Sequence, residues 1–98
     1  KYAIPYMKQS GGGSIINIAS ILAHQPKLSD MIYVSGKGAL LHLTRQLAVE
    51  YAPDNIRVNS VSPGDICVRP PHDETPDTTS FDALISPIRR RGMPGDVA

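Results

Sequence analysis

Three side chains in this sequence have the types and spacing needed to handle a proton at a carbonyl or hydroxyl oxygen. Ser20 follows an apolar run, and Tyr33 and Lys37 lie four residues apart at the start of a long helical pattern. Residues at this spacing share one helix face, so a phenol and an ammonium group would lie together there. Because a free phenol ionises only at a pH of about 10, it needs a neighbouring cation to act as an acid or base near neutrality.

The charge of an ammonium group at this spacing is large enough to lower the pKa of the phenol. Two unit charges ~4 Å apart interact by ~4 kcal/mol at an effective dielectric constant of about 20, which stabilises a phenolate substantially. We therefore predict that Tyr33 is the general acid and base, and that Lys37 stabilises its phenolate form. Ser20 is predicted to donate a hydrogen bond to the substrate oxygen, which positions and polarises it.

One helix and two strands are expected to bring these residues to one edge of a sheet. The apolar run Ser14–Ala19 reads as a buried strand, Met31–Tyr51 as a helix and Ile56–Ser62 as a second strand. Together they form a βαβ crossover, which is right-handed in nearly all known cases. The carboxyl ends of parallel strands line the ligand crevice, so Ser20 and the turn Pro63-Gly64 would meet there.

The segments between these elements contain signals that end helices and form turns. Residues 1–9 read as the end of a helix that Ser10-Gly11-Gly12-Gly13 terminates. The stretch 21–30 is expected to be a loop short enough to keep Ser20 close to Tyr33. Pro53 and Asn55 end the long helix, because Pro cannot continue it and Asn tolerates a left-handed turn.

These residues together resemble the short-chain dehydrogenase/reductase family. The matching segments are Gly11-Gly12-Gly13-Ser14-Ile15-Ile16-Asn17-Ile18-Ala19-Ser20, Tyr33-Val34-Ser35-Gly36-Lys37-Gly38-Ala39, Leu43-Thr44-Arg45, Leu47-Ala48, Glu50-Tyr51-Ala52, Ile56-Arg57-Val58-Asn59 and Pro63-Gly64-Asp65-Ile66. The resemblance covers roughly residues 7–66 and resumes weakly at Arg91-Gly92-Met93-Pro94. A Tyr-x-x-x-Lys pair alone is common in helices, but its combination with the upstream Ser and the downstream Pro-Gly turn is specific.

The resemblance implies a fold class and a reaction. The fold would be α/β, a partial Rossmann-type doubly wound parallel sheet made of one βαβ unit, a helix tail and a substrate loop. The reaction would interconvert an alcohol and a ketone or aldehyde by hydride transfer with NAD or NADP, two cofactors that this segment does not distinguish. The family's fourth catalytic residue, an Asn on a preceding helix, would fall before Lys1, and Asn17 is expected to be structural instead, with its side chain bonded to neighbouring backbone.

The resemblance also implies which residues bind the cofactor. Lys37 would bond the hydroxyls of the nicotinamide ribose, beside Tyr33. Pro63 and Gly64 would lie against the nicotinamide, and the backbone of Ile66 would contact its carboxamide.

Two positions depart from the family pattern. Gly36 replaces the Ala or Ser that usually precedes the catalytic Lys, and a Gly within a helix costs about 1 kcal/mol relative to Ala. Val68 stands where a Thr often reaches the nicotinamide carboxamide, and Val cannot donate that hydrogen bond.

The chain has 98 residues, and we expect it to be part of a larger protein. Two parallel strands do not make an independently stable sheet, because such sheets need cover on both faces. The Gly-rich turn that cradles a cofactor pyrophosphate has no counterpart here. We therefore predict that residues 1–98 are a C-terminal-half fragment of a single domain, with a catalytic βαβ segment at 1–66 and a substrate-loop region at 67–98.

Composition bounds the remaining possibilities. The formal net charge of +1 argues against a nucleic-acid partner, and the lone Cys67 excludes an internal disulfide. No apolar stretch approaches the ~20 residues that span a bilayer, and His24, His42 and His72 lack the spacing of metal ligands. We read the basic run Arg89-Arg90-Arg91 as a solvated loop or helix start rather than a phosphate or partner site. The expected location is cytoplasmic, and the resemblance implies a homodimer or homotetramer of the full-length protein.

Two other functions remain open at this point. The same fold can serve as a non-catalytic cofactor-binding or scaffolding subunit, or this chain can be an inactive fragment. The fold also supports enoyl reduction, epimerisation or dehydration. Placement of Ser20 and Tyr33 on one carbonyl favours alcohol and carbonyl chemistry over these alternatives, with a small-molecule substrate.

Overall fold

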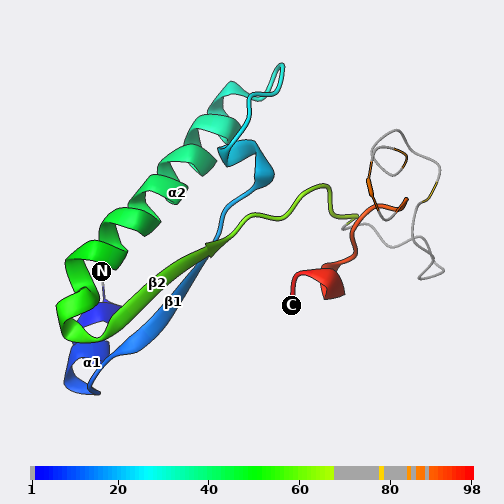
Figure 1. Ribbon diagram of the computed structural model, residues 1–98. Coiled ribbons are helices and arrows are strands. Elements are labelled where there is room, and N and C mark those ends of the chain that lie inside the picture. The colour runs from blue at the N-terminus through cyan, green and yellow to red at the C-terminus, as the bar shows by residue number, and fades with distance from the viewer. Residues whose placement is uncertain (1, 68–77, 79–83, 85, 88) are drawn as a thin grey trace. The chain divides into compact units, whose positions relative to one another are not determined.

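The computed structural model describes residues 2–67, 78, 84, 86–87 and 89–98 (Figure 1). The chain divides into two compact units, Lys1–Ser62 and Pro63–Ala98, and each is described by itself. The prediction about Val68 lies outside the described residues, as does most of the predicted substrate-loop region.

The first unit is a βαβ arrangement. Strand β1 (Gly13–Ile18) pairs in parallel with β2 (Ile56–Val61), in a register that joins Gly13 to Ile56 and Ile18 to Val61. Helix α2 (Met31–Tyr51) connects the two strands and runs along one face of the pair (Figure 1). The helix has the predicted bounds, and each strand differs from its predicted range by one residue at one or both ends.

One short α-helix and three 3₁₀ turns complete the helices and strands of the described residues. Helix α1 (Ala3–Gln9) precedes β1, and the 3₁₀ turns η1 (Ile21–Ala23) and η2 (Ala52–Asp54) precede and follow α2. A third 3₁₀ turn, η3 (Pro94–Asp96), lies in the second unit. The predicted loop 21–30 thus begins with a helical turn. None of the helices in the described part of the chain is long and apolar enough to cross a membrane.

A polar chain fixes α2 against β1. The Asn17 amide Nδ2 donates to Thr44 Oγ1 at 2.9 Å, and this hydroxyl donates to the Leu40 carbonyl oxygen at 2.8 Å. Thr44 is only 4% exposed, so both of these hydrogen bonds are shielded from water. Asn17 therefore has the predicted structural role, although its partner is a side chain. Lys37 lies seven residues before Thr44, two helical turns away on the same face.

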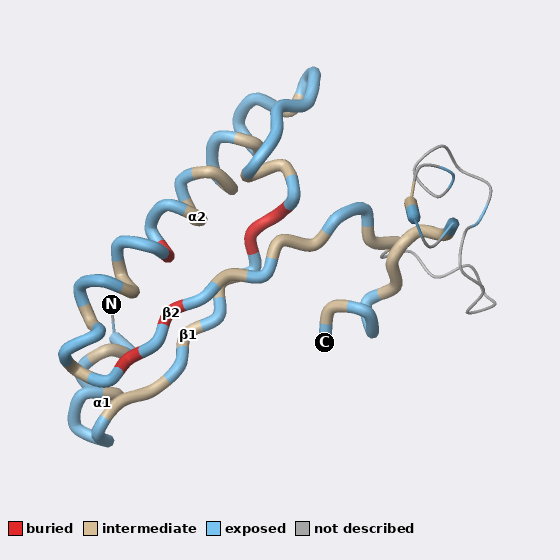
Figure 2. Tube along the Cα trace, in the orientation of Figure 1, coloured by how far each residue is buried: buried red, intermediate tan, exposed pale blue. Residues whose placement is uncertain are grey.

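The sheet is covered on one face only within the described residues. The buried apolar residues among those described are Ala19, Ile56 and Val58, and the buried positions of β2 belong to the strand that α2 contacts most (Figure 2). On β1 exposed positions alternate with half-buried ones, and Ile16 and Ile18 are 61% and 51% exposed. Parallel strands carry apolar residues on both faces because helices normally cover both. The strand sequences thus match a sheet with a second covered face.

A glycine turn joins the amino-terminal ends of the two strands. The Gly13 N–H donates to the Asn55 carbonyl at 3.1 Å, and Asn55 Nδ2 donates to the Gly11 carbonyl at 2.9 Å. Gly12 has a φ of +131°, and a Cβ there would lie 2.4 Å from the Asn55 carbonyl oxygen. Because that oxygen is backbone, only glycine fits at position 12.

Replacing Gly12 by Ala is therefore expected to lower the free energy of unfolding by about 2–3 kcal/mol, from steric overlap added to backbone strain. Gly11→Ala is the matched control, because Gly11 also has a positive φ of 83° but no atom within 4 Å of its added Cβ. That control is expected to cost only about 1 kcal/mol. Thermal unfolding of the full-length protein measures both values, and equal losses would contradict the steric argument.

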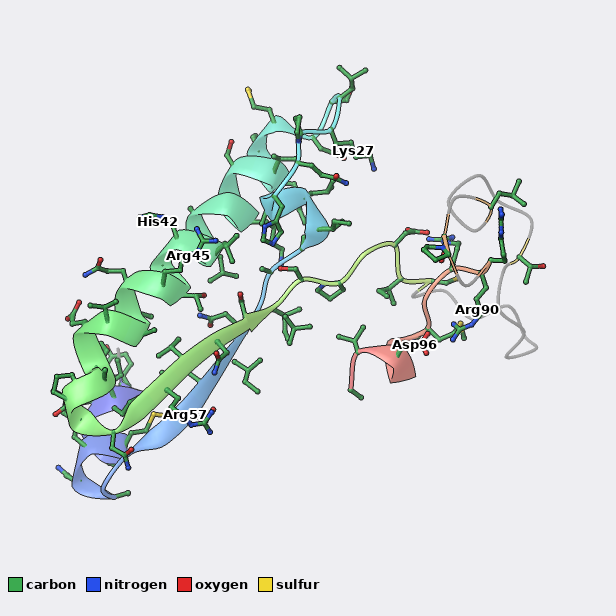
Figure 3. The ribbon with its side chains drawn as sticks, viewed as in Figure 1. Lys27, His42, Arg45, Arg57, Arg90 and Asp96 are labelled. Carbon is green, nitrogen blue, oxygen red and sulfur yellow. The ribbon has the colours of Figure 1, made fainter. Side chains whose placement is uncertain are left out.

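In the second unit, residues 65–67 lie beside residues 91–93. Ile66 and Gly92 form a parallel β-bridge. Beside it, the Arg90 guanidinium donates to both oxygens of Asp96, at 2.7 and 3.0 Å (Figure 3). The Met93 N–H donates to the same carboxylate at 2.7 Å, which caps η3.

These contacts predict a pH dependence. The hydrogen bonds from Arg90, followed by that from Met93, lower the pKa of Asp96 from 3.8 to about 2. A carboxyl whose pKa is lower in the folded state stabilises that state above its ordinary pKa and loses this contribution as the pH falls toward the folded value. We expect η3 to loosen between about pH 4 and pH 2. A pH titration of the Asp96 carboxyl ¹³C chemical shift should measure the lowered pKa, and Arg90→Gln should raise that pKa. An unchanged pKa in this variant would contradict the role given to Arg90.

Candidate active site

Ser20 lies just past the carboxyl end of β1 and is only 6% exposed. Its backbone is extended and its Oγ accepts a hydrogen bond from the Leu22 N–H at 3.1 Å, so it caps η1. A hydroxyl that accepts one hydrogen bond still has its own proton to donate. The cap therefore fixes the oxygen of Ser20 and leaves its O–H able to meet a substrate oxygen.

Lys37 reaches from α2 to the carboxyl end of β1. Its Nζ donates to the Ile18 carbonyl oxygen at 2.7 Å and lies 5.7 Å from the centroid of the Tyr33 ring. An ammonium within about 6 Å of an aromatic ring is attracted to its face. Lys Nζ carries three donors, so two remain after the bond to Ile18. The structure thus brings Tyr33 and Lys37 together at this end of the sheet, as the spacing predicts.

Tyr33 stands in the first turn of α2 and is 49% exposed. The turn that Ser20 caps packs against this helix. A Cβ at Gly38 would lie 3.9 Å from the Ala23 carbonyl, an ordinary contact distance, whereas one at Gly36 would meet nothing within 4 Å. The glycine at position 36, which departs from the family pattern, therefore removes no side-chain contact within the first unit.

A histidine joins the segments that follow the two strands. His24 Nε2 lies 3.2 Å from Ser62 Oγ, across 38 residues of sequence. This hydrogen bond holds the η1 turn to the residue before Pro63. The sequence places His24 only in a loop, and this partner was missed. His42 is exposed on α2 (Figure 3).

The predicted cofactor turn lies in the second unit, where the bridge between Ile66 and Gly92 sets its backbone. The Gly92 N–H donates to the Asp65 carbonyl at 3.0 Å, and the Cys67 N–H donates to the Gly92 carbonyl at 2.9 Å. In a parallel bridge one residue bonds the two neighbours of its partner, so Gly92 bonds Asp65 and Cys67 rather than Ile66. The N–H and C=O of Ile66 itself make no hydrogen bond to the described residues.

The basic run lies in a loop, as the sequence predicts, but its three arginines have partners that the sequence does not indicate. Arg90 pairs with Asp96, Arg91 pairs with Asp65 through two hydrogen bonds, and Arg89 Nη1 donates to the Leu84 carbonyl at 2.6 Å. The Arg90 and Arg91 side chains are 29% and 28% exposed. Asp96 and Asp65, which lie six and 26 residues away in sequence, neutralise the charges of Arg90 and Arg91.

Neither a surface hollow beside β2 nor any cluster of metal-binding side chains adds a second candidate site among the described residues. A hollow of about 400 Å³ lies beside the amino-terminal half of β2, lined by Ala48, Ala52 and residues 55–59. Ligands of open α/β sheets bind at the opposite, carboxyl ends of the strands. Among the residues that the structure places, no group of three or more His, Cys, Asp or Glu side chains could hold a metal ion.

Known proteins are similar to this chain in both sequence and fold. The family model for short chain dehydrogenases matches residues 1–77. A 7alpha-hydroxysteroid dehydrogenase from Clostridium sardiniense is 41% identical over the whole chain, which spans 38% of that protein. A 7alpha-hydroxysteroid dehydrogenase from Escherichia coli is 37% identical over 96% of the chain and 37% of its own length.

Solved structures agree with these relatives. An acetoin dehydrogenase from Salmonella typhimurium matches 97% of the chain with a TM-score of 0.84 and 34% identity, over 38% of its own chain. An acetoin dehydrogenase from Enterobacter cloacae matches 98% of the chain with a TM-score of 0.82 and 34% identity, over 37% of its own chain. The chain therefore spans less than two fifths of each of these four proteins.

These likenesses confirm the predicted fold class, an α/β chain that forms part of a Rossmann-type parallel sheet. Its family model covers most of the sequence, and the Ser, Tyr-x-x-x-Lys and Pro-Gly segments that suggested the family lie inside the match. The chain belongs to the short-chain dehydrogenase/reductase family.

Proposed function

We propose that this chain carries the catalytic segment of an oxidoreductase that interconverts an alcohol and a ketone or aldehyde with NAD or NADP. The observation that supports it most is the position of Lys37, whose ammonium bonds the Ile18 carbonyl at 2.7 Å and stands 5.7 Å from the Tyr33 ring centroid. That contact ties the cation to the end of β1, two residues before Ser20. The relatives named as dehydrogenases support the same reaction class.

Each of the three side chains then has one task. Tyr33 gives its hydroxyl proton to the substrate oxygen during reduction and takes it back during oxidation. Lys37 stabilises the phenolate that this leaves, because its positive charge stays near the ring. Ser20 donates a hydrogen bond to the same substrate oxygen, and its fixed cap geometry needs no rearrangement for this.

The residues present fit a nicotinamide cofactor at two places. Lys37 retains two donors for the ribose hydroxyls after its bond to Ile18. Ile66 presents a main-chain N–H and C=O that no described residue bonds, and a primary carboxamide offers one acceptor and one donor group to such a pair. When bound, the nicotinamide supplies or accepts the hydride. Contact of Pro63 and Gly64 with the ring is part of the same proposal.

The test uses the full-length protein. NADH and NADPH are titrated by fluorescence, and oxidation of small secondary alcohols is followed by the absorbance of the reduced cofactor. We expect saturable binding of one nucleotide and turnover of at least one alcohol in the panel. Absence of nucleotide binding would contradict the proposal, and nucleotide binding without turnover of any alcohol or carbonyl would favour the non-catalytic alternative.

A further inference from the structure

We propose that Arg91 and Asp65 form a positioning pair for the nicotinamide end of the cofactor. They would act through the backbone of Ile66, which they hold in place without touching the ligand themselves. The inference rests on the proposed function and adds to it a specific control of cofactor orientation.

The pair joins two segments 26 residues apart in sequence. Arg91 Nη2 donates to Asp65 Oδ1 at 2.9 Å, and Arg91 Nε donates to the other carboxylate oxygen. A two-point contact of this kind fixes direction as well as distance, because the guanidinium and the carboxylate are both planar. Both side chains are partly covered, at 28% and 40% exposure.

The pair flanks the β-bridge that directs the Ile66 backbone. Gly92 forms hydrogen bonds with the Asp65 carbonyl and the Cys67 N–H. The N–H and C=O of Ile66 therefore point away from Gly92, to the opposite side of this segment. A Cβ at Gly92 would lie 2.4 Å from Ile66 Cδ1 and 3.4 Å from the Asp65 carbonyl oxygen. The shorter contact is with the flexible end of the Ile66 side chain and the longer one is an ordinary contact with the backbone, so the two segments pack closely beside the ion pair.

A main-chain N–H and C=O on one residue recognise a primary carboxamide by two hydrogen bonds, which depend strongly on their direction. Loosening residues 65–67 would misdirect both bonds at once. The adenosine, pyrophosphate and ribose parts of the cofactor do not use these bonds. Loss of the pair should therefore weaken binding of the nicotinamide end alone.

The experiment compares two ligands on the full-length protein. One is the reduced nucleotide that the wild type binds, and the other is ADP-ribose, or its 2′-phosphate for an NADPH-binding protein, which lacks the nicotinamide. For Arg91→Gln and Asp65→Asn we expect the Kd of the reduced nucleotide to rise about tenfold and that of the ADP-ribose ligand to change by less than about twofold.

Arg89→Gln is the matched control, because it removes the same charge from the same segment, and the Arg89 guanidinium bonds Leu84 rather than Asp65. It should leave both Kd values unchanged. Equal weakening of both ligands in the Arg91 and Asp65 variants, or no weakening of either, would overturn this inference while leaving the proposed function intact. A wild-type protein that binds neither NADH nor NADPH would overturn both.

Discussion

Replacing Tyr33 by Phe is expected to lower kcat by about 10³-fold or more while leaving the Kd of the cofactor within about twofold of the wild-type value. The substitution removes only the hydroxyl, which is the proposed proton donor and acceptor. The ring beside the Lys37 ammonium is retained, so the local packing should survive. Steady-state kinetics and fluorescence titration of the full-length protein measure the two quantities.

Tyr51→Phe is the matched control for this variant. Tyr51 ends the same helix and its ring lies 5.1 Å from the Lys8 ammonium, so it is also a tyrosine beside a lysine. Its hydroxyl has no place in the proposed reaction, and we expect nearly wild-type kcat. Turnover by Tyr33→Phe at the rate of this control would remove the general acid and base from the account.

Lys37→Met is expected to damage both catalysis and cofactor binding. The variant keeps an unbranched side chain one atom shorter than that of Lys, but it loses the positive charge and all three donors. We expect kcat to fall by about 10²–10³-fold, as for loss of a preorganised donor, and the cofactor Kd to rise about tenfold. This combined loss distinguishes Lys37 from Tyr33, whose substitution should affect kcat alone.

The control for Lys37→Met is Lys27→Met. Lys27 lies before α2 and pairs with Asp30 at 3.4 Å, with a side chain that is 62% exposed. It carries the same charge near the same end of the helix but makes no contact with β1 or Tyr33 that the structure shows. A cofactor Kd unchanged in Lys37→Met would contradict the dual role, and equal effects in both variants would indicate a general electrostatic influence.

The elements that carry the site could be predicted from the sequence because local signals define them. The apolar spacing of residues 31–51 and the stop at Pro53 predict α2 with its observed bounds. The Tyr33 and Lys37 side chains meet because helix geometry alone brings residues four apart together. The strand β1 is a largely apolar run, β2 has apolar residues at positions 56, 58 and 61, and each lies within one residue of its predicted range.

The contacts between distant segments could not be predicted in this way. His24 and Ser62 are 38 residues apart, and Asp65 and Arg91 are 26 apart, so their pairing depends on how turns direct the chain. The bond from Lys37 to the Ile18 carbonyl was missed for a similar reason, because it requires the packing of α2 on β1. In the second unit, the sequence pointed to the turn Pro63-Gly64-Asp65-Ile66 and, weakly, to Arg91-Gly92-Met93-Pro94, but not to the pairing between them.

The placement of the Pro63-Gly64 turn beside Ser20 and Tyr33 stays a prediction, as do the division of the chain at residue 66 and the oligomeric state. The turn belongs to the second unit and the two side chains to the first. The cytoplasmic location stays a prediction as well.

Hydride transfer itself is the most direct measurement of the central claim. The full-length protein is incubated with its oxidised cofactor and a secondary alcohol that carries deuterium on the carbinol carbon, and the recovered nucleotide is examined by mass spectrometry and NMR. The account predicts one deuterium at C4 of the nicotinamide ring in the wild type and loss of this transfer in Tyr33→Phe. A nucleotide that binds but returns without deuterium, with every alcohol in the panel, would contradict it.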